Sequence, residues 1–212
     1  MMKSHLIFIG APGSGKGTQA YKFVSERQFK HISTGDLLRG EIAKKSHLGL
    51  EVKKVMDEGQ LVSDELVIRL LQANINLASI QYIFDGYPRN LAQAKTLDKE
   101  VLGSAPSLAV YFDIDMNRLV ERLTNRRTCK DCGAIYNLKS KMPKVMGMCD
   151  QCGGTNIVQR ADDKEDVIKN RLQVFQDTIS PVLEYYQDLG RLMKVDAEKS
   201  VDEIFNQISS KV

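Results

Sequence analysis

The sequence predicts an α/β protein in which a parallel β-sheet is covered by helices on both faces. Four short apolar runs alternate with longer segments of helical periodicity, and they lie at residues 6–9, 82–84, 108–114 and 192–195. A glycine-rich loop or an acidic residue stands at or near the end of three of these runs, at Gly10, Asp85 and Asp113. Functional residues gather at the carboxyl ends of such strands, so this edge is expected to carry the site.

Length and composition are those of a globular protein. The chain has 212 residues, enough to bury the core of one domain with small insertions. Its net charge of +3 is slight and gives no support for a nucleic-acid partner. The first apolar run is too short for a signal peptide, and no later run is long enough to cross a bilayer. We expect a cytoplasmic protein with no membrane partner.

Two segments interrupt the alternation of strands and helices. Residues 31–62 are mostly helical and contain the helix-start pattern Ser33-Thr-Gly-Asp36, whereas residues 125–163 carry the cysteines and several glycines. We therefore expect a core made of residues 1–32, 63–124 and 164–212, with one insertion at residues 33–62 and a second at residues 125–163.

The loop Gly10-Ala-Pro-Gly-Ser-Gly-Lys-Gly-Thr18 is suited to phosphate. Its glycines let successive amides point at an anion, and the helix that follows adds its positive N-terminal end. Lys16 is expected to reach the β- and γ-phosphates, and Thr18 the phosphate or the shell of a magnesium ion. The usual pattern has Ser or Thr directly after the lysine, whereas here Gly17 intervenes. A glycine-rich turn without a ligand is the alternative.

The acidic residues and histidines near the strand ends differ in what they predict. Asp85 follows a strand and faces the loop, where it is expected to hold Mg²⁺ through water, although it could also end the strand as a turn residue. Asp113 and Asp115 either support the site or cap the next helix, and they are left out of the predicted site.

The histidines show no spacing for catalysis or metal binding and are treated as incidental: His5, His31 and His47.

All four cysteines form two Cys-x-x-Cys pairs, which contain Cys129, Cys132, Cys149 and Cys152. In a reducing compartment this spacing predicts one tetrahedral Zn²⁺ site. A site with four sulfur ligands has no open position for water, so the metal would be structural. Iron in place of zinc and oxidation to disulfides are the alternatives.

The loop at residues 10–18 resembles the adenylate kinase form of the phosphate-binding loop, and the resemblance continues over nearly the whole chain. The further motifs lie at residues 33–39, 59–65 and 85–93, and the cysteines resemble the long lid of zinc-bearing bacterial adenylate kinases. The resemblance implies a P-loop kinase with an AMP-binding insertion at residues 33–62 and a zinc-bearing lid at residues 125–163. It also implies a monomer that converts ATP and AMP reversibly into two ADP with Mg²⁺, in purine nucleotide salvage and energy homeostasis.

The same resemblance implies the roles of individual residues. The ATP-binding residues would be Gly13, Ser14, Gly15, Lys16, Gly17, Thr18, Arg126, Ile135, Tyr136 and Lys199. The AMP-binding residues would be Thr34, Arg39, Gln60, Leu61, Val62, Gly86, Tyr87, Pro88, Arg89, Gln93, Arg160 and Arg171. Catalysis would depend on Lys16, Arg89, Arg122, Arg126, Arg160 and Arg171. Tyr136 could equally be a packing residue of the lid, and arginine is suited to these roles because its guanidinium binds phosphate through two hydrogen bonds.

The sequence departs from the family pattern at Asn125, Ser63, Met142 and Ala197, none of which removes a charge that would bind phosphate. Asn125 replaces a hinge glycine and would tolerate a positive φ. Ser63 replaces a proline and frees one backbone torsion.

Three other functions stay open: a kinase for UMP or CMP, a nucleic-acid-binding ATPase, and a structural zinc module with a vestigial nucleotide site.

Overall fold

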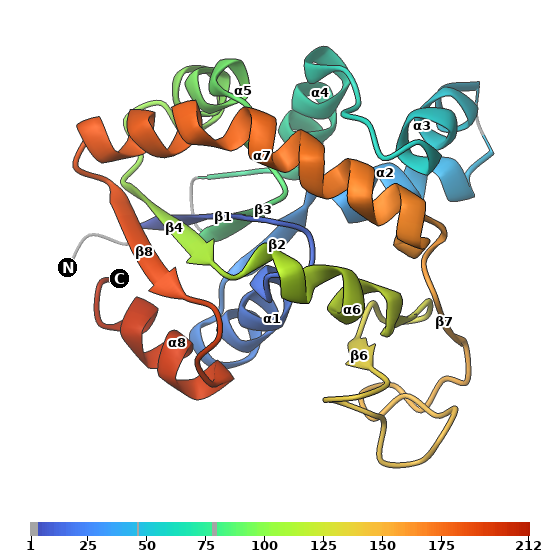
Figure 1. Cartoon of the computed structure of the whole chain (residues 1–212). Coiled ribbons are helices and arrows are strands. Elements are labelled where there is room, and N and C mark those ends of the chain that lie inside the picture. The colour runs from blue at the N-terminus through green and yellow to red at the C-terminus, as the bar shows by residue number, and fades with distance from the viewer. Residues whose placement is uncertain (1–3, 46, 78–79) are drawn as a thin grey trace.

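The computed structural model describes residues 4–45, 47–77 and 80–212, and it contains a five-stranded parallel sheet (Figure 1). The strand order is β2-β3-β1-β4-β8, and each neighbouring pair is parallel. The strands are β1 (His5–Gly10), β2 (Lys30–Ser33), β3 (Tyr82–Asp85), β4 (Ser107–Asp113) and β8 (Leu192–Asp196). The predicted α/β class and the four predicted strands are confirmed.

Helices cover both faces of this sheet. They are α1 (Lys16–Arg27), α2 (Thr34–Ala43), α3 (His47–Asp57), α4 (Asp64–Asn74), α5 (Leu91–Thr96), α6 (Leu119–Thr124), α7 (Glu165–Asp188) and α8 (Val201–Ser209). Shorter helical segments are η1 (Leu97–Leu102), η2 (Met116–Arg118) and η3 (Ala161–Asp163). In Figure 1, α1 and α8 lie on one face of the sheet and α7 crosses the other.

Side chains alternate between two apolar layers because successive residues of a strand point to opposite faces. Ile7 and Ile9 of β1 pack on the α7 side, in the layer that contains Val182. Leu6 and Phe8 point the other way, toward α1 and α8, where the ring of Phe8 is 6.2 Å from that of Phe23. Both faces of β1 are therefore buried, in agreement with the unbroken apolar run at residues 6–9.

The register of the strands brings the predicted site to one edge. Phe8 pairs with Asp85, Ser33 also pairs with Asp85, and Gly10 pairs with Phe112. The ends of β1, β2 and β3 therefore lie side by side, and the glycine-rich loop follows directly.

Strand β2 was missed by the sequence analysis, which placed residues 31–33 at the start of a helical insertion. Its four residues lie at the edge of the sheet and show no regular alternation of polar and apolar side chains. Lys30 and Ile32 point to the same face of the strand, yet Lys30 is exposed and Ile32 is buried. The helix start that was predicted beside it is confirmed, because the Ser33 hydroxyl accepts a hydrogen bond from the Asp36 amide at 3.2 Å.

Two further expectations about single residues are decided by the backbone. Asn125 has a φ of −88°, so its tolerance of positive φ is not used in this conformation. Asp115 caps η2 by accepting from the Asn117 amide, as the capping interpretation predicted. Asp113 instead forms an ion pair with Lys194, and neither residue is among those that line the two cavities described below.

The segment at residues 125–163 forms a second, antiparallel sheet with the order β6-β5-β7. Its strands are β5 (Arg126–Cys129), β6 (Ile135–Asn137) and β7 (Ile157–Val158), and the segment projects from the core next to α6 (Figure 1).

Across the described ranges of the chain, no helix combines the length and the apolar character needed to cross a membrane.

Replacing Ser63 with proline should stabilise the protein. Ser63 precedes α4 with a φ of −55°, which a proline ring adopts without strain, and its side chain makes no capping hydrogen bond. Reduced freedom of the unfolded chain is worth about 0.4–1 kcal/mol, or about 1–4 °C in melting temperature. Ser33→Pro is the control and should lower the melting temperature, because Ser33 caps α2 at a φ of −99°. A lower melting temperature for Ser63→Pro would contradict the prediction.

Candidate active site

A cavity of about 620 Å³ lies at the carboxyl edge of the sheet, and a smaller one adjoins it. The large cavity is lined by the glycine-rich loop, the end of β3, residues 122–141 and the first half of α7, and the small one by α2, α4 and residues 86–93. All the residues predicted for nucleotide, magnesium and catalysis line one of the two cavities except Ser14, which is buried within the loop, whereas the four cysteines lie outside both cavities.

The glycine-rich loop has the conformation that its sequence predicts. Gly13 and Gly15 have φ values of 85° and 99°, where a side chain would be strained. Helix α1 begins at Lys16, so the free amides of its first turn face the cavity. At Gly17 a Cβ atom would lie 3.0 Å from Ile135 Cδ1, so residues 125–163 approach the loop where a larger side chain would interfere.

Lys16 is half-buried, and its side chain folds back on the loop. Its Nζ atom donates to the carbonyls of Gly10 and Ala11 at 2.7 and 2.9 Å. Burial lowers the pKa of Lys16 to about 8; the charge of Asp85 opposes this shift, and that of Arg89 adds to it. A phosphate group beside this lysine would favour its charged form.

Asp85 lies opposite Lys16, and its carboxylate is held by a histidine. His31 Nε2 is 3.2 Å from Asp85 Oδ2, and both side chains are mostly buried. Burial acts to raise the pKa of Asp85, but the His31 hydrogen bond and the Lys16 charge outweigh it, so that this pKa lies below its ordinary value. The prediction that His31 is incidental was wrong, because β2, which carries it beside β3, had not been recognised.

Two acidic residues that the sequence analysis did not select hold the arginines of the site. Arg126 makes a two-pronged contact with Asp163, at 2.8 Å from Nε and 2.5 Å from Nη2. Arg171 reaches Asp162 at 3.0 Å and Asp163 at 3.4 Å. Asp163 is fully buried. The run Arg160-Ala-Asp-Asp contained the signal, since paired carboxylates next to predicted phosphate-binding arginines are natural partners for them.

Arg39 and Arg160 approach the same space from different segments. Arg39 pairs with Asp36 at 2.5 Å and lies 3.9 Å from Asp162, while Arg160 lies 3.9 Å from Asp36. Burial, together with neighbouring arginines, lowers the pKa values of Arg89 and Arg160 to about 10. These guanidinium groups remain charged at neutral pH, so the cavity wall is strongly cationic. Arg122 also lines the cavity, from the end of α6.

The smaller cavity contains the residues predicted to recognise a base. The Thr34 hydroxyl donates to Gly86 O at 2.9 Å. Gln93 Oε1 accepts from the Arg89 amide at 2.7 Å, and its Nε2 donates to Asp64 Oδ1 at 2.6 Å. A glutamine amide has two acceptor and two donor positions, so one of each stays free after these bonds. Gln93 is thus held in one orientation and can still bond to the edge of a base.

The large cavity is also lined by Ile135, Tyr136 and Lys199, the residues predicted for the ATP ribose and base. Tyr136 is buried, and its hydroxyl donates to Cys149 Sγ at 3.3 Å and accepts from the Asp150 amide at 2.7 Å. This contact lowers the pKa of the Cys149 thiol. Tyr136 therefore packs within the cysteine-bearing segment, and it also borders the cavity.

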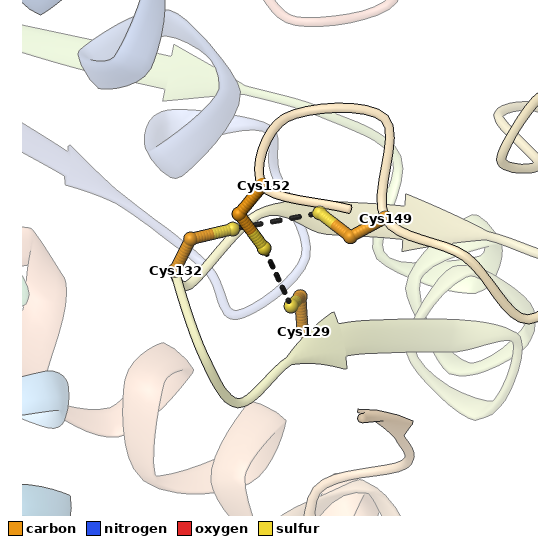
Figure 2. Close-up of side chains that lie close together, drawn as sticks. All are labelled: Cys129, Cys132, Cys149 and Cys152. Carbon is orange, nitrogen blue, oxygen red and sulfur yellow. Dashed lines mark hydrogen bonds between the residues drawn. The ribbon is translucent and has the colours of Figure 1, made fainter. Parts of the chain in front are cut away.

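The four cysteine sulfurs converge on one point, as Figure 2 shows. They all lie within 4.8 Å of one another, with 3.7 Å between Cys129 and Cys152 and 3.5 Å between Cys132 and Cys149. Four thiolates around one tetrahedral ion, each about 2.3 Å from it, are about 3.8 Å apart. The donor set and its spacing therefore fit a single metal ion of the zinc type, and the separations are too long for disulfide bonds.

Comparison with known proteins agrees with this geometry. The sequence model of the family described as "Adenylate kinase" matches residues 8–191. The chain belongs to the adenylate kinase family. It is 44% identical to an adenylate kinase of Thermodesulfovibrio yellowstonii, over 96% of each chain. It is also 42% identical to that of Carboxydothermus hydrogenoformans, over 97% of each, and 40% identical to that of Thermosipho africanus, over 96% of this chain and 97% of the relative.

Loss of one cysteine should lower the thermal stability of the protein more than it lowers the turnover. In an adenylate kinase with a structural metal, the energy of metal binding is energy of folding. Cys129→Ser should therefore lower the melting temperature, on the order of 10 °C, while the turnover at moderate temperature changes by less than about twofold. A chelator should destabilise the wild type and have little effect on the variant. An unchanged melting temperature with a large loss of activity would contradict this prediction.

The half-buried Lys16 should couple ATP binding to proton uptake. Its pKa is lowered to about 8, so most ligand-free chains carry a neutral lysine at pH 9, and phosphate restores the charge. Calorimetry in two buffers of different ionisation enthalpy should show uptake approaching one proton at pH 9 and much less at pH 7. Lys16→Met is the control and should show none. The same uptake in both proteins would contradict the assignment.

Proposed function

We propose that this protein catalyses the reversible, Mg²⁺-dependent transfer of the terminal phosphoryl group of ATP to AMP, giving two ADP. The observation that carries the proposal is a cationic cavity with a smaller cavity adjoining it, each with residues suited to a nucleoside. Ile135 and Lys199 line the large cavity, and Thr34 and Gln93 line the small one. Two nucleotides bound in this way would direct their phosphates at each other, next to Lys16.

Catalysis would come from positioning and charge. Phosphoryl transfer has a loose transition state whose charge is spread over the equatorial oxygens, so no dedicated general base is required. The loop amides and Lys16 would hold the β- and γ-phosphates of the donor, and Arg39 and Arg89 the phosphate of the acceptor. Arg122, Arg126, Arg160 and Arg171 would stabilise the group in transit. The family pattern and the shared cavity support these roles.

Asp85 has the properties required of the residue that holds magnesium. It ends β3 at the cavity, and the contact with His31 together with the Lys16 charge keeps it ionised. We assign it the water-mediated position beside Mg²⁺, which would neutralise charge on the β- and γ-phosphates.

The cysteine-bearing segment, residues 125–163, would be a lid over the donor nucleotide and the insertion at residues 33–62 a cover over the acceptor. The core would be residues 1–32, 63–124 and 164–212. A closed lid excludes water, which would otherwise accept the phosphoryl group. The cysteine metal would be Zn²⁺ with a structural role, since four sulfur ligands leave no open position. We further propose that the protein acts as a cytoplasmic monomer without a nucleic-acid partner.

A coupled assay with MgATP and a panel of acceptors tests this proposal. AMP, UMP, CMP and GMP are offered in parallel, and AMP alone should be phosphorylated at a high rate. Gln93→Leu should raise the KM for AMP about 10-fold or more, since a buried hydrogen-bonding partner is lost. A preference for UMP or CMP would show that Thr34 and Gln93 are misassigned. Hydrolysis of ATP that depends on added nucleic acid would overturn the proposal.

A further inference from the structure

Tyr21 is a residue at the edge of the site to which the sequence analysis gave no role. It lies on α1, one turn after the glycine-rich loop, and lines the large cavity. Its hydroxyl donates to the carbonyl oxygen of Cys132 at 3.4 Å. This hydrogen bond joins the core to the cysteine-bearing segment across 111 positions of sequence.

The partner surface is shaped to receive this hydroxyl. Gly133 follows Cys132 with a φ of 78°, and a Cβ atom there would lie 2.5 Å from Tyr21 Oη. A side chain at position 133 would therefore collide with the tyrosine in this arrangement. The turn at Gly133 needs glycine for its backbone conformation, and the missing side chain leaves the space that Tyr21 occupies.

The ring of Tyr21 has a second neighbour, on the side of Asp85. It packs edge-on against His31, with 6.0 Å between ring centroids and an angle of 66°. His31 Nε2 in turn contacts Asp85 Oδ2 at 3.2 Å. One tyrosine thus touches both the turn that carries Cys132 and the histidine that holds Asp85.

We propose that Tyr21 is a positioning residue that fixes the lid against the phosphate-binding loop and supports His31 behind Asp85. Its hydroxyl acts on the lid through the Cys132 carbonyl, and its ring acts on Asp85 through His31. Ile135 approaches Gly17 one turn earlier on α1, so the lid lies against the first two turns of this helix at two points. The inference rests on the proposed function for its kinetic consequences, but its geometric part does not.

Two variants distinguish the role of the Tyr21 hydroxyl from that of its ring. Tyr21→Phe removes the hydroxyl and keeps the ring, so it should raise the KM for ATP about 2- to 10-fold, the range expected for one hydrogen bond. The KM for AMP should stay within about twofold, and kcat should not fall. Tyr21→Ala also removes the support of His31 and should in addition raise the Mg²⁺ concentration that gives half-maximal activity.

Tyr185→Phe is the matched control. It removes a tyrosine hydroxyl that donates to Asp98 at 2.9 Å, away from the cavity, and should leave all three constants unchanged. An unchanged KM for ATP in Tyr21→Phe, or an equal rise in the KM for AMP, would overturn the role of the hydroxyl.

A measurement without turnover distinguishes failure of this inference from failure of the proposed function. Energy transfer between dyes placed at the exposed positions Met146 and Lys211, through non-canonical residues that spare the cysteines, reports the separation of lid and core. Ligand-free Tyr21→Phe should show longer separations than the wild type, and Tyr185→Phe should not. Identical distributions in all three proteins would overturn the inference, whatever reaction the wild type catalyses.

Discussion

The burial of several cations around one cavity is the constraint on which the rest of the structure depends. The basic side chains that line this space include Lys16, Arg39, Arg89, Arg126, Arg160 and Arg171. The carboxylates that face them are Asp36, Asp85, Asp162 and Asp163, so positive charge is in excess. A charge taken out of water is costly unless it is paired. The pKa values of Lys16, Arg89 and Arg160 are lowered mainly because burial disfavours their charged forms. A polyphosphate anion bound among them would offset this free-energy cost.

These cations come from segments that are distant in the sequence. Lys16 is fixed by the loop after β1 and Arg89 by the turn after β3, both at the carboxyl edge of the sheet. Arg126 comes from the cysteine-bearing segment and Arg171 from α7, and buried Asp163 ties the two together. The cluster is therefore complete only when the cysteine-bearing segment lies against the core, as it does here. If phosphate binds among these cations, its binding and the placement of this segment depend on each other.

Much of this arrangement could be predicted from the sequence, and the exceptions have a common cause. The buried strands were visible because both of their faces are apolar, and the loop and the cysteines because their spacing is dictated by phosphate and metal. Strand β2 was not visible, since an edge strand of four mixed residues has no clear pattern. The roles of His31, Asp162 and Tyr21 depend on contacts between elements distant in the chain, and no local pattern encodes them.

The central claim is that two nucleotides bind with their phosphates in one shared cationic cavity. Calorimetric titration with two adenosines joined by five phosphates tests it most directly, because such a compound spans both nucleoside pockets only if they face the same space. We expect one molecule per chain, bound far more tightly than ATP or AMP, with neither nucleotide able to bind afterwards. Binding of two molecules per chain, or an affinity no higher than that of ATP with AMP still able to bind, would contradict the account.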